Sequence, residues 1–192
     1  MATPQPQEIM EFETSELWEL WLSGNFSKPE GIWLKIAKKG TGVTTVTYIE
    51  ALEVALCYGW IDGQMKSVDN TYFVQKFTPR RTKSIWSKIN TERVERLINE
   101  GRMKDPGYEQ IEKAKADGRW DQAYGSSKNS SLPEDFLKVL KENKFAFEFF
   151  KSLNRTNLYA IYFRLETAKR PETREKRIKE IVEMLSQGKK YH

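Results

Sequence analysis

Residues 61–77 read Ile61-Asp-Gly-Gln-Met-Lys-Ser-Val-Asp-Asn-Thr-Tyr-Phe-Val-Gln-Lys-Phe77, and this stretch predicts a β-hairpin. Its two strands are residues 61–67 and 71–77, and the intervening Asp69-Asn70 is a dipeptide typical of tight turns. A further strand is expected at residues 31–38, where apolar side chains occupy every second position. Together these stretches predict a small antiparallel sheet of about three strands.

Helical patterns surround the predicted strands. Thr47-Tyr-Ile-Glu50 has the spacing of a capping box, and it predicts a helix that runs to Tyr58 and ends at Gly59. Three more helices are expected, at residues 15–22 before Gly24, from a cap at Ser87 or Asn90 to Gly101, and from Asp105-Pro106 to Gly118. The sheet and these helices predict an α+β body over residues 13–124.

The last third of the sequence is helical in pattern. Small polar residues at 125–132 predict a linker. Ser131-Leu-Pro-Glu134 has the spacing of a second capping box, and apolar stripes follow it up to a last helix that begins at Pro171. We therefore expect an all-helical C-terminal module, without strands, at residues 133–190.

The composition is that of a folded, mildly basic protein. The 192 residues include 32 Lys and Arg against 27 Asp and Glu, with 12% aromatic residues, which excludes a disordered chain dominated by charge. A lone cysteine excludes a disulfide framework, and the lone histidine, His192, argues against histidine catalysis and histidine-bound zinc. The sequence contains no P-loop or dinucleotide-binding glycine motif. We predict no metal and no cofactor.

The sequence predicts a cytoplasmic protein that does not insert into a membrane. Its first residues lack the basic start and the apolar stretch of a secretory signal. The most apolar stretch, residues 51–61, is interrupted by Glu53 and is too short to span a bilayer. Cys57 lies in this stretch without a cation or base beside it in sequence, so we expect a packed thiol rather than a nucleophile.

The strongest local signal is a cationic stretch between Gln75 and Asn90, with no acidic residue and with Phe77 and Trp86 among the cations. Arginine binds phosphate or carboxylate in a bidentate fashion, and the free amides of a following helix add positive charge. The stretch predicts a site for an anionic ligand, with these candidate residues: Trp60, Asp62, Arg80, Arg81, Ser84, Trp86 and Asn90. The alternative is a solvated loop in which Trp86 anchors the core and the arginines pair with acids.

Asp62 stands at the start of an apolar strand, where an unpaired carboxylate is costly. The expected partner is Arg80 or Arg81, which follow the neighbouring strand of the hairpin. Such an ion pair would hold the loop in place. The alternative is a functional carboxylate that acts as a base or as a hydrogen-bond acceptor.

A second basic segment, residues 168–179, contains six basic and two acidic residues. Basic side chains on phosphates supply much of the affinity for nucleic acid. The spacings from Glu172 to Lys176 and from Glu175 to Lys179 are instead those of an exposed, self-stabilised helix face. If nucleic acid binds, the expected contacts are Lys76, Lys83, Lys88, Lys169, Arg170, Arg174 and Arg177.

Four stretches carry a family resemblance: Glu30-Gly-Ile-Trp-Leu-Lys35, Tyr58-Gly-Trp-Ile-Asp-Gly63, Phe77 to Asn90, and Ala160 to Ile178. Over about residues 15–190 the chain resembles the YdeI/OmpD-associated proteins, also called bacteriocin-protection proteins. The resemblance implies an α+β body with a helical C-terminal part. It also implies an association with resistance to antimicrobial peptides or bacteriocins and with porins, but no established reaction.

Three functions remain open. The first is a non-catalytic stress or defence protein whose basic and aromatic loop binds an anionic small molecule or protein. The second is a nucleic-acid-binding protein that uses segments 76–93 and 164–179. The third is an enzyme that acts on an anionic substrate through Asp62 and the arginine pair Arg80 and Arg81.

Overall fold

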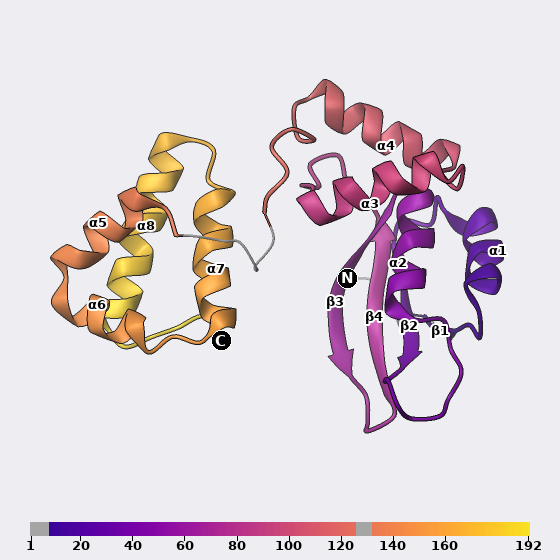
Figure 1. The fold of residues 1–192 in the computed structure, drawn as a ribbon, viewed down its shortest axis with the longest axis horizontal. Coiled ribbons are helices and arrows are strands. Elements are labelled where there is room, and N and C mark those ends of the chain that lie inside the picture. Colours follow the sequence, from indigo (N-terminus) through magenta and orange to yellow (C-terminus); the bar gives the residue numbers. More distant parts are fainter. Residues whose placement is uncertain (1–7, 126–131) are drawn as a thin grey trace, which may run out of the picture. The chain divides into compact units, whose positions relative to one another are not determined.

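The computed structural model describes residues 8–125 and 132–192, and within them the chain forms four strands and eight helices (Figure 1). The contacts divide the chain into two units, Met1–Ala123 and Tyr124–His192, which are described separately below. The predicted α+β fold with a helical C-terminal region is confirmed. The predicted linker at 125–132 lies almost entirely outside the described residues.

The sheet of the N-terminal unit has the order β1-β2-β4-β3. The hairpin of β3 (Trp60–Ser67) and β4 (Tyr72–Pro79) and the pairing of β2 (Ile32–Ala37) with β4 are antiparallel, as the sequence predicts. One further strand, β1 (Ile9–Glu11), pairs in parallel with β2 and makes the sheet mixed. The sequence pattern missed β1 because three residues are too few to show an alternation.

The hairpin turn is fixed by an aspartate, as its sequence predicts. The Oδ1 atom of Asp69 accepts hydrogen bonds from the backbone amides of Thr71 and Tyr72, at 2.6 and 2.7 Å. The register of β3 on β4 then shifts between Asp62 and Met65, at a β-bulge. Asp62 therefore lies beyond the bulge from the turn, at the end of β3 that is next to α2.

Four helices belong to this unit: α1 (Ser15–Asn25), α2 (Tyr48–Cys57), α3 (Lys88–Asn99) and α4 (Asp105–Ala116). Figure 1 shows α2 against the sheet, with α1 and α3 beside it. The prediction that Gly24 ends the first helix is wrong, because α1 continues through this glycine to Asn25. Glycine weakens a helix by only about 1 kcal/mol, and burial of Trp18 and Leu22 offsets that cost.

The capping box at the start of α2 is confirmed. The Thr47 side chain accepts from the amide of Glu50, and the Glu50 carboxylate accepts from the amide of Thr47 at 2.9 Å. Gly59 ends the helix with φ +73°, and a Cβ atom at this position would lie 2.6 Å from the Pro106 carbonyl oxygen. Only glycine fits this turn, which leads directly from α2 into β3.

The C-terminal unit consists of α5 (Glu134–Glu142), α6 (Lys144–Lys151), α7 (Arg155–Glu166) and α8 (Pro171–Ser186). The helices surround a core that includes Phe136, Leu140, Ile161 and Leu165, all fully buried. The predicted second capping box falls partly on Ser131, which lies outside the described residues. In the described part, Pro133 is the N-cap of α5 and makes no side-chain cap hydrogen bond.

Candidate functional site

The predicted cationic stretch forms a tightly fixed connection between the sheet and α3, which we call the cationic loop (residues 80–88). At its start, the amide of Arg80 donates to the Gly59 carbonyl at 3.0 Å. Ser84 then closes a turn, since its Oγ accepts from the amide of Arg81 at 2.9 Å and its own amide donates to the Arg81 carbonyl at 2.8 Å. Ser87 is the N-cap of α3, one of the two caps that the sequence allows.

Arg80 is buried and contacts the loop from the interior of the protein. Its side chain is 7% exposed, and its Cζ atom lies 3.4 Å from the centroid of the Trp86 ring. Its Nη1 donates to the Ile85 carbonyl at 3.2 Å. Trp86 is 2% exposed and also packs on Trp120, with ring centroids 4.9 Å apart. A guanidinium on an indole face is a favourable cation–π contact, so this pair stabilises the loop.

A second arginine, Arg119, holds the loop from the segment after α4. Its Nη1 donates to the Ser84 carbonyl at 2.7 Å, while its Nε donates to the Asp117 carboxylate at 2.8 Å. No local sequence pattern indicates this role, because Arg119 is far from the loop in the chain and follows an ordinary helix end. Two consecutive carbonyls of the loop, those of Ser84 and Ile85, are thus bound by buried or half-buried guanidinium groups.

The outer surface of the loop is cationic and partly apolar. Arg81, Lys83 and Lys88 are exposed, and within the described part of the chain no carboxylate lies within ion-pair distance of any of them. Two apolar side chains lie among these cations, Ile85 at 47% exposure and Ile89 at 46%. The loop therefore presents unneutralised positive charge beside apolar surface.

Asp62 does not join the cationic loop. Its carboxylate accepts a hydrogen bond from the Tyr48 hydroxyl at 2.9 Å, and the ion pairs among the described residues include none between Asp62 and Arg80 or Arg81. The described partner of Asp62 is thus Tyr48 rather than an arginine of the loop. The partner is Tyr48 because β3 places Asp62 on the face of the sheet against which α2 begins. No sequence spacing links these two residues.

The other two candidate residues have structural partners of their own. Trp60 is fully buried, and its indole nitrogen donates to the Phe26 carbonyl at 2.6 Å. The Asn90 side-chain oxygen accepts from Arg93 Nη1 at 2.9 Å, one turn further along α3. Of the candidate ligand-binding residues, the structure brings together Arg80, Ser84 and Trp86 within the loop, with Arg81 on its surface.

The predicted nucleic-acid contacts belong to both units, with Lys76, Lys83 and Lys88 in the N-terminal one and the other four in the C-terminal one. Lys76 lies on β4, where burial lowers its pKa and its Nζ atom is 5.8 Å from the Trp33 ring. In the C-terminal unit, Lys169 and Arg170 are exposed. Arg174 instead binds the Asp135 carboxylate through two nitrogens and donates to the Leu165 carbonyl at 2.9 Å.

The basic segment is in part a self-stabilised helix face, although not through the expected pairs. The ion pair that forms on α8 joins Lys176 to Glu180, at 3.8 Å. The neighbouring Arg177 donates to the Arg164 carbonyl and, at 3.0 Å, to the Thr167 hydroxyl. Arg174 and Arg177 are thus engaged within the C-terminal unit.

Two family models match the chain, each over one of its parts. Residues 10–110 match the model described as Domain of unknown function (DUF8412), which covers more than half of the chain. The chain belongs to the DUF8412 family. Residues 129–188 match the model described as Bacteriocin-protection, YdeI or OmpD-Associated. Searches of curated proteins and of solved structures gave no match.

The DUF8412 match contains both Asp62 and the cationic loop. The resemblance to the bacteriocin-protection family, expected over about residues 15–190, is confirmed for residues 129–188, while a different model matches the N-terminal part. The C-terminal match supports a bacteriocin-protection-related role for this DUF8412 protein. Its printed description names a phenotype and no reaction.

Three further observations concern the thiol, metal-ligand groups and helix lengths of the DUF8412 protein. Burial raises the pKa of the Cys57 thiol to about 11, so this thiol stays protonated at neutral pH and is a poor nucleophile. Over residues 8–125 and 132–192, no group of three or more His, Cys, Asp or Glu side chains is arranged to hold a metal ion. No helix in the same residues is both long and apolar enough to cross a bilayer.

Proposed function

We propose that this DUF8412 protein is a non-catalytic protein with a bacteriocin-protection-related role, which binds an acidic and partly apolar segment of a partner protein through the cationic loop. The C-terminal family match supports the role, and the loop supports the mode of binding. The observation that carries the proposal is that two sets of cations have different roles at the loop. Arg80 and Arg119 fix its backbone from inside, while Arg81, Lys83 and Lys88 point their charge outward.

This arrangement favours association with an anionic partner for two reasons. The loop is already ordered by internal hydrogen bonds, so little conformational entropy is lost on binding. Among the described residues no carboxylate forms an ion pair with Arg81, Lys83 or Lys88, so their charge is available to attract and hold an acidic segment.

The apolar surface favours a protein segment over nucleic acid at this loop. Single-stranded nucleic acid binds through aromatic rings on which bases stack, but the one aromatic ring of the loop, Trp86, is covered. The exposed side chains next to the cations are instead Ile85 and Ile89, which match aliphatic residues of a partner. The nucleic-acid alternative also loses Arg174, which the Asp135 carboxylate engages.

The catalytic alternative has less support from the geometry. Asp62 and Arg80 have different described partners, the Tyr48 hydroxyl for the carboxylate and the Ile85 carbonyl for the guanidinium. A concerted action of these groups on one anionic substrate would require them to meet at one place.

The proposal is tested by fluorescence anisotropy on the full chain, with a labelled short peptide of alternating glutamate and leucine and a labelled single-stranded DNA as probes. Replacement of the three outward cations (Arg81→Gln, Lys83→Gln, Lys88→Gln) is expected to weaken peptide binding by about ten- to a hundredfold, since each surface ion pair contributes about 0.5–1 kcal/mol. The matched control is Lys169→Gln, Arg170→Gln, Lys179→Gln, which removes one arginine and two lysines from exposed positions on α8 and just before it.

Peptide binding that the control leaves unchanged and the loop variant weakens supports the proposal. Equal loss in both variants, or binding of DNA alone, would contradict it. In the second case the nucleic-acid alternative would take its place.

A further inference from the structure

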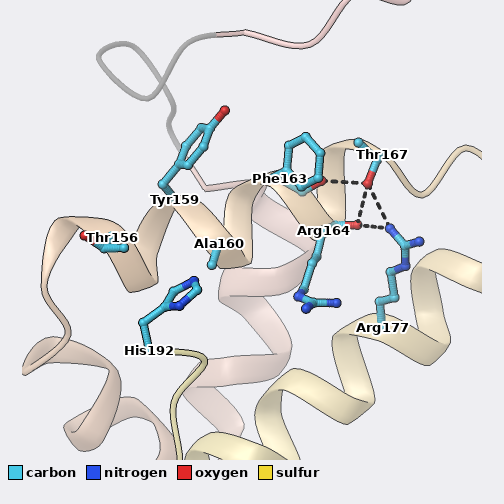
Figure 2. A pocket seen from close by; sticks show the side chains of 8 residues that line it. All are labelled: Thr156, Tyr159, Ala160, Phe163, Arg164, Thr167, Arg177 and His192. Carbon is cyan, nitrogen blue, oxygen red and sulfur yellow. Dashed lines mark hydrogen bonds between the residues drawn. The ribbon is translucent and has the colours of Figure 1, made fainter. Parts of the chain in front are cut away.

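The C-terminal unit has a pocket of about 400 Å³ along α7 (Figure 2). Its lining includes Tyr159, Ala160, Phe163, Arg164, Arg177 and His192. This volume is in the range of small-molecule sites and is too small for a folded partner. The pocket belongs to the unit that does not contain the cationic loop, so it is independent of the function proposed above.

Two arginines supply the charge of the pocket. Arg177 reaches it from α8 and is fixed by its hydrogen bonds to the Arg164 carbonyl and the Thr167 hydroxyl. The Arg164 guanidinium lies with its Cζ atom 4.2 Å from the centroid of the Tyr191 ring. In the part of the chain that the structure describes, neither guanidinium has a carboxylate within ion-pair distance.

These contacts orient the two guanidinium groups without neutralising them. A carbonyl or hydroxyl partner occupies one or two of the five N–H donors of an arginine, and an aromatic partner covers one face of the guanidinium. The Arg177 hydrogen bonds that are described use only Nη1, so its other nitrogens keep donors for a ligand. Such preoriented groups bind carboxylate or phosphate oxygens with little loss of side-chain entropy.

An apolar wall completes the pocket. Tyr159 and Phe163 follow one another on α7, with ring centroids 6.3 Å apart, and Phe163 is held from behind by Tyr124 in an edge-to-face contact at 5.0 Å. The small side chain of Ala160 leaves space between the aromatic rings and Arg164. Figure 2 shows the Ala160 side chain and the His192 ring on the same side of α7. The wall suits a flat, apolar group.

We propose that this pocket binds a small molecule in which one carboxylate or phosphate group is attached to an aromatic ring. The anionic group lies between Arg164 and Arg177, and the ring packs over Ala160 against Phe163. The anionic group or the aromatic ring alone would bind less tightly. An anion without a ring leaves the aromatic side chains exposed to water, and a neutral ring makes no ion pair with the two arginines. The pocket thereby assigns a ligand site to the part of the chain that matches the bacteriocin-protection family.

The test is isothermal titration of the full chain with phenyl phosphate and benzoate, and with inorganic phosphate and phenol as half-ligands. We expect saturable binding of at least one aromatic anion, with either half-ligand weaker by about tenfold or more. Arg164→Gln is expected to weaken the aromatic anion by about tenfold, because it removes one charged hydrogen-bond donor but keeps the carbonyl that Arg177 uses. Lys179→Gln, on an exposed position of α8, is the control of equal charge change.

A second variant tests the cavity itself. Ala160→Leu keeps the charge and nearly the same helix propensity but fills the space over Ala160, so it is expected to abolish binding of the aromatic anion. The melting temperature of the variant checks that the fold persists. Binding of inorganic phosphate as tight as that of phenyl phosphate, or aromatic binding that survives both Arg164→Gln and Ala160→Leu, would overturn the proposal. So would the absence of binding by both aromatic anions. If benzoate binds and phenyl phosphate does not, the ligand is a carboxylate; the reverse assigns a phosphate.

Discussion

The Arg80 guanidinium lies 3.4 Å from the centroid of the Trp86 ring, in a place that solvent hardly reaches. The next residue, Arg81, is exposed on the surface of the same loop. Two adjacent arginines therefore have different roles, since Arg80 stabilises the loop and Arg81 exposes its charge to solvent. This division makes the loop both ordered and cationic.

Replacement of the two arginines by lysine separates these tasks. Arg80→Lys removes the planar group that stacks on Trp86 and donates to the Ile85 carbonyl, and we expect it to lower the free energy of unfolding by about 2–3 kcal/mol. Arg81→Lys keeps an exposed charge and is expected to change it by less than about 0.5 kcal/mol. Urea unfolding followed by tryptophan fluorescence measures both, because all six tryptophans lie in the N-terminal unit. Equal losses would show that Arg80 has no special structural role.

The turn between α2 and β3 gives a second prediction. Gly59 and Gly101 both have positive φ, +73° and +69°, but only at Gly59 would a new Cβ atom meet a backbone atom. We expect Gly101→Ala to cost about 1–2 kcal/mol, the strain of the backbone alone. Gly59→Ala is expected to cost at least about 1 kcal/mol more, because the Pro106 carbonyl must move. The same fluorescence-detected unfolding compares the two, and equal costs would contradict the described contact.

A third prediction concerns pH. The hydrogen bonds from Arg174 lower the pKa of Asp135 in the folded protein below its usual value, so the ion pair stabilises the C-terminal unit at neutral pH. This stability is present above the unfolded pKa of about 3.9 and is lost as the pH falls through the lower, folded pKa. Because the Asp135 carboxylate is half exposed, we expect a contribution of less than about 1 kcal/mol.

Two measurements check this pH dependence. The side-chain carboxyl chemical shift of Asp135 should titrate at a lower pH than that of an ordinary aspartate, and Arg174→Gln should return its pKa toward the ordinary value. Asp135→Asn should remove the difference in stability between neutral and acidic pH that the pair supplies. A titration of Asp135 at its ordinary pKa in the unaltered protein would refute the pairing.

Much of the fold follows from local patterns in the sequence. The hairpin, the capping box at Thr47 and the glycine at position 59 are each determined by residues close together in the chain, and the structure has all three. Strand β1 was missed because it acquires its structure from pairing with β2, and a partner distant in sequence leaves no local periodicity.

The contacts of the candidate site likewise join residues that are distant in sequence. The sequence shows two adjacent arginines but not which of them faces the interior, since that depends on where Trp86 and Trp120 meet. The Tyr48–Asp62 hydrogen bond and the contact from Arg119 to the Ser84 carbonyl join residues on different elements. Such partners are fixed by tertiary packing, and one sequence without its fold does not reveal them.

Binding of an acidic, partly apolar segment by the cationic loop is tested most directly by a map of amide chemical shifts on the full chain during titration with the peptide of alternating glutamate and leucine. We predict saturable shifts concentrated at residues 81–89, and their loss when Arg81, Lys83 and Lys88 are replaced by glutamine. A peptide that binds elsewhere on the chain, or that leaves these amides unchanged at every concentration, would contradict it.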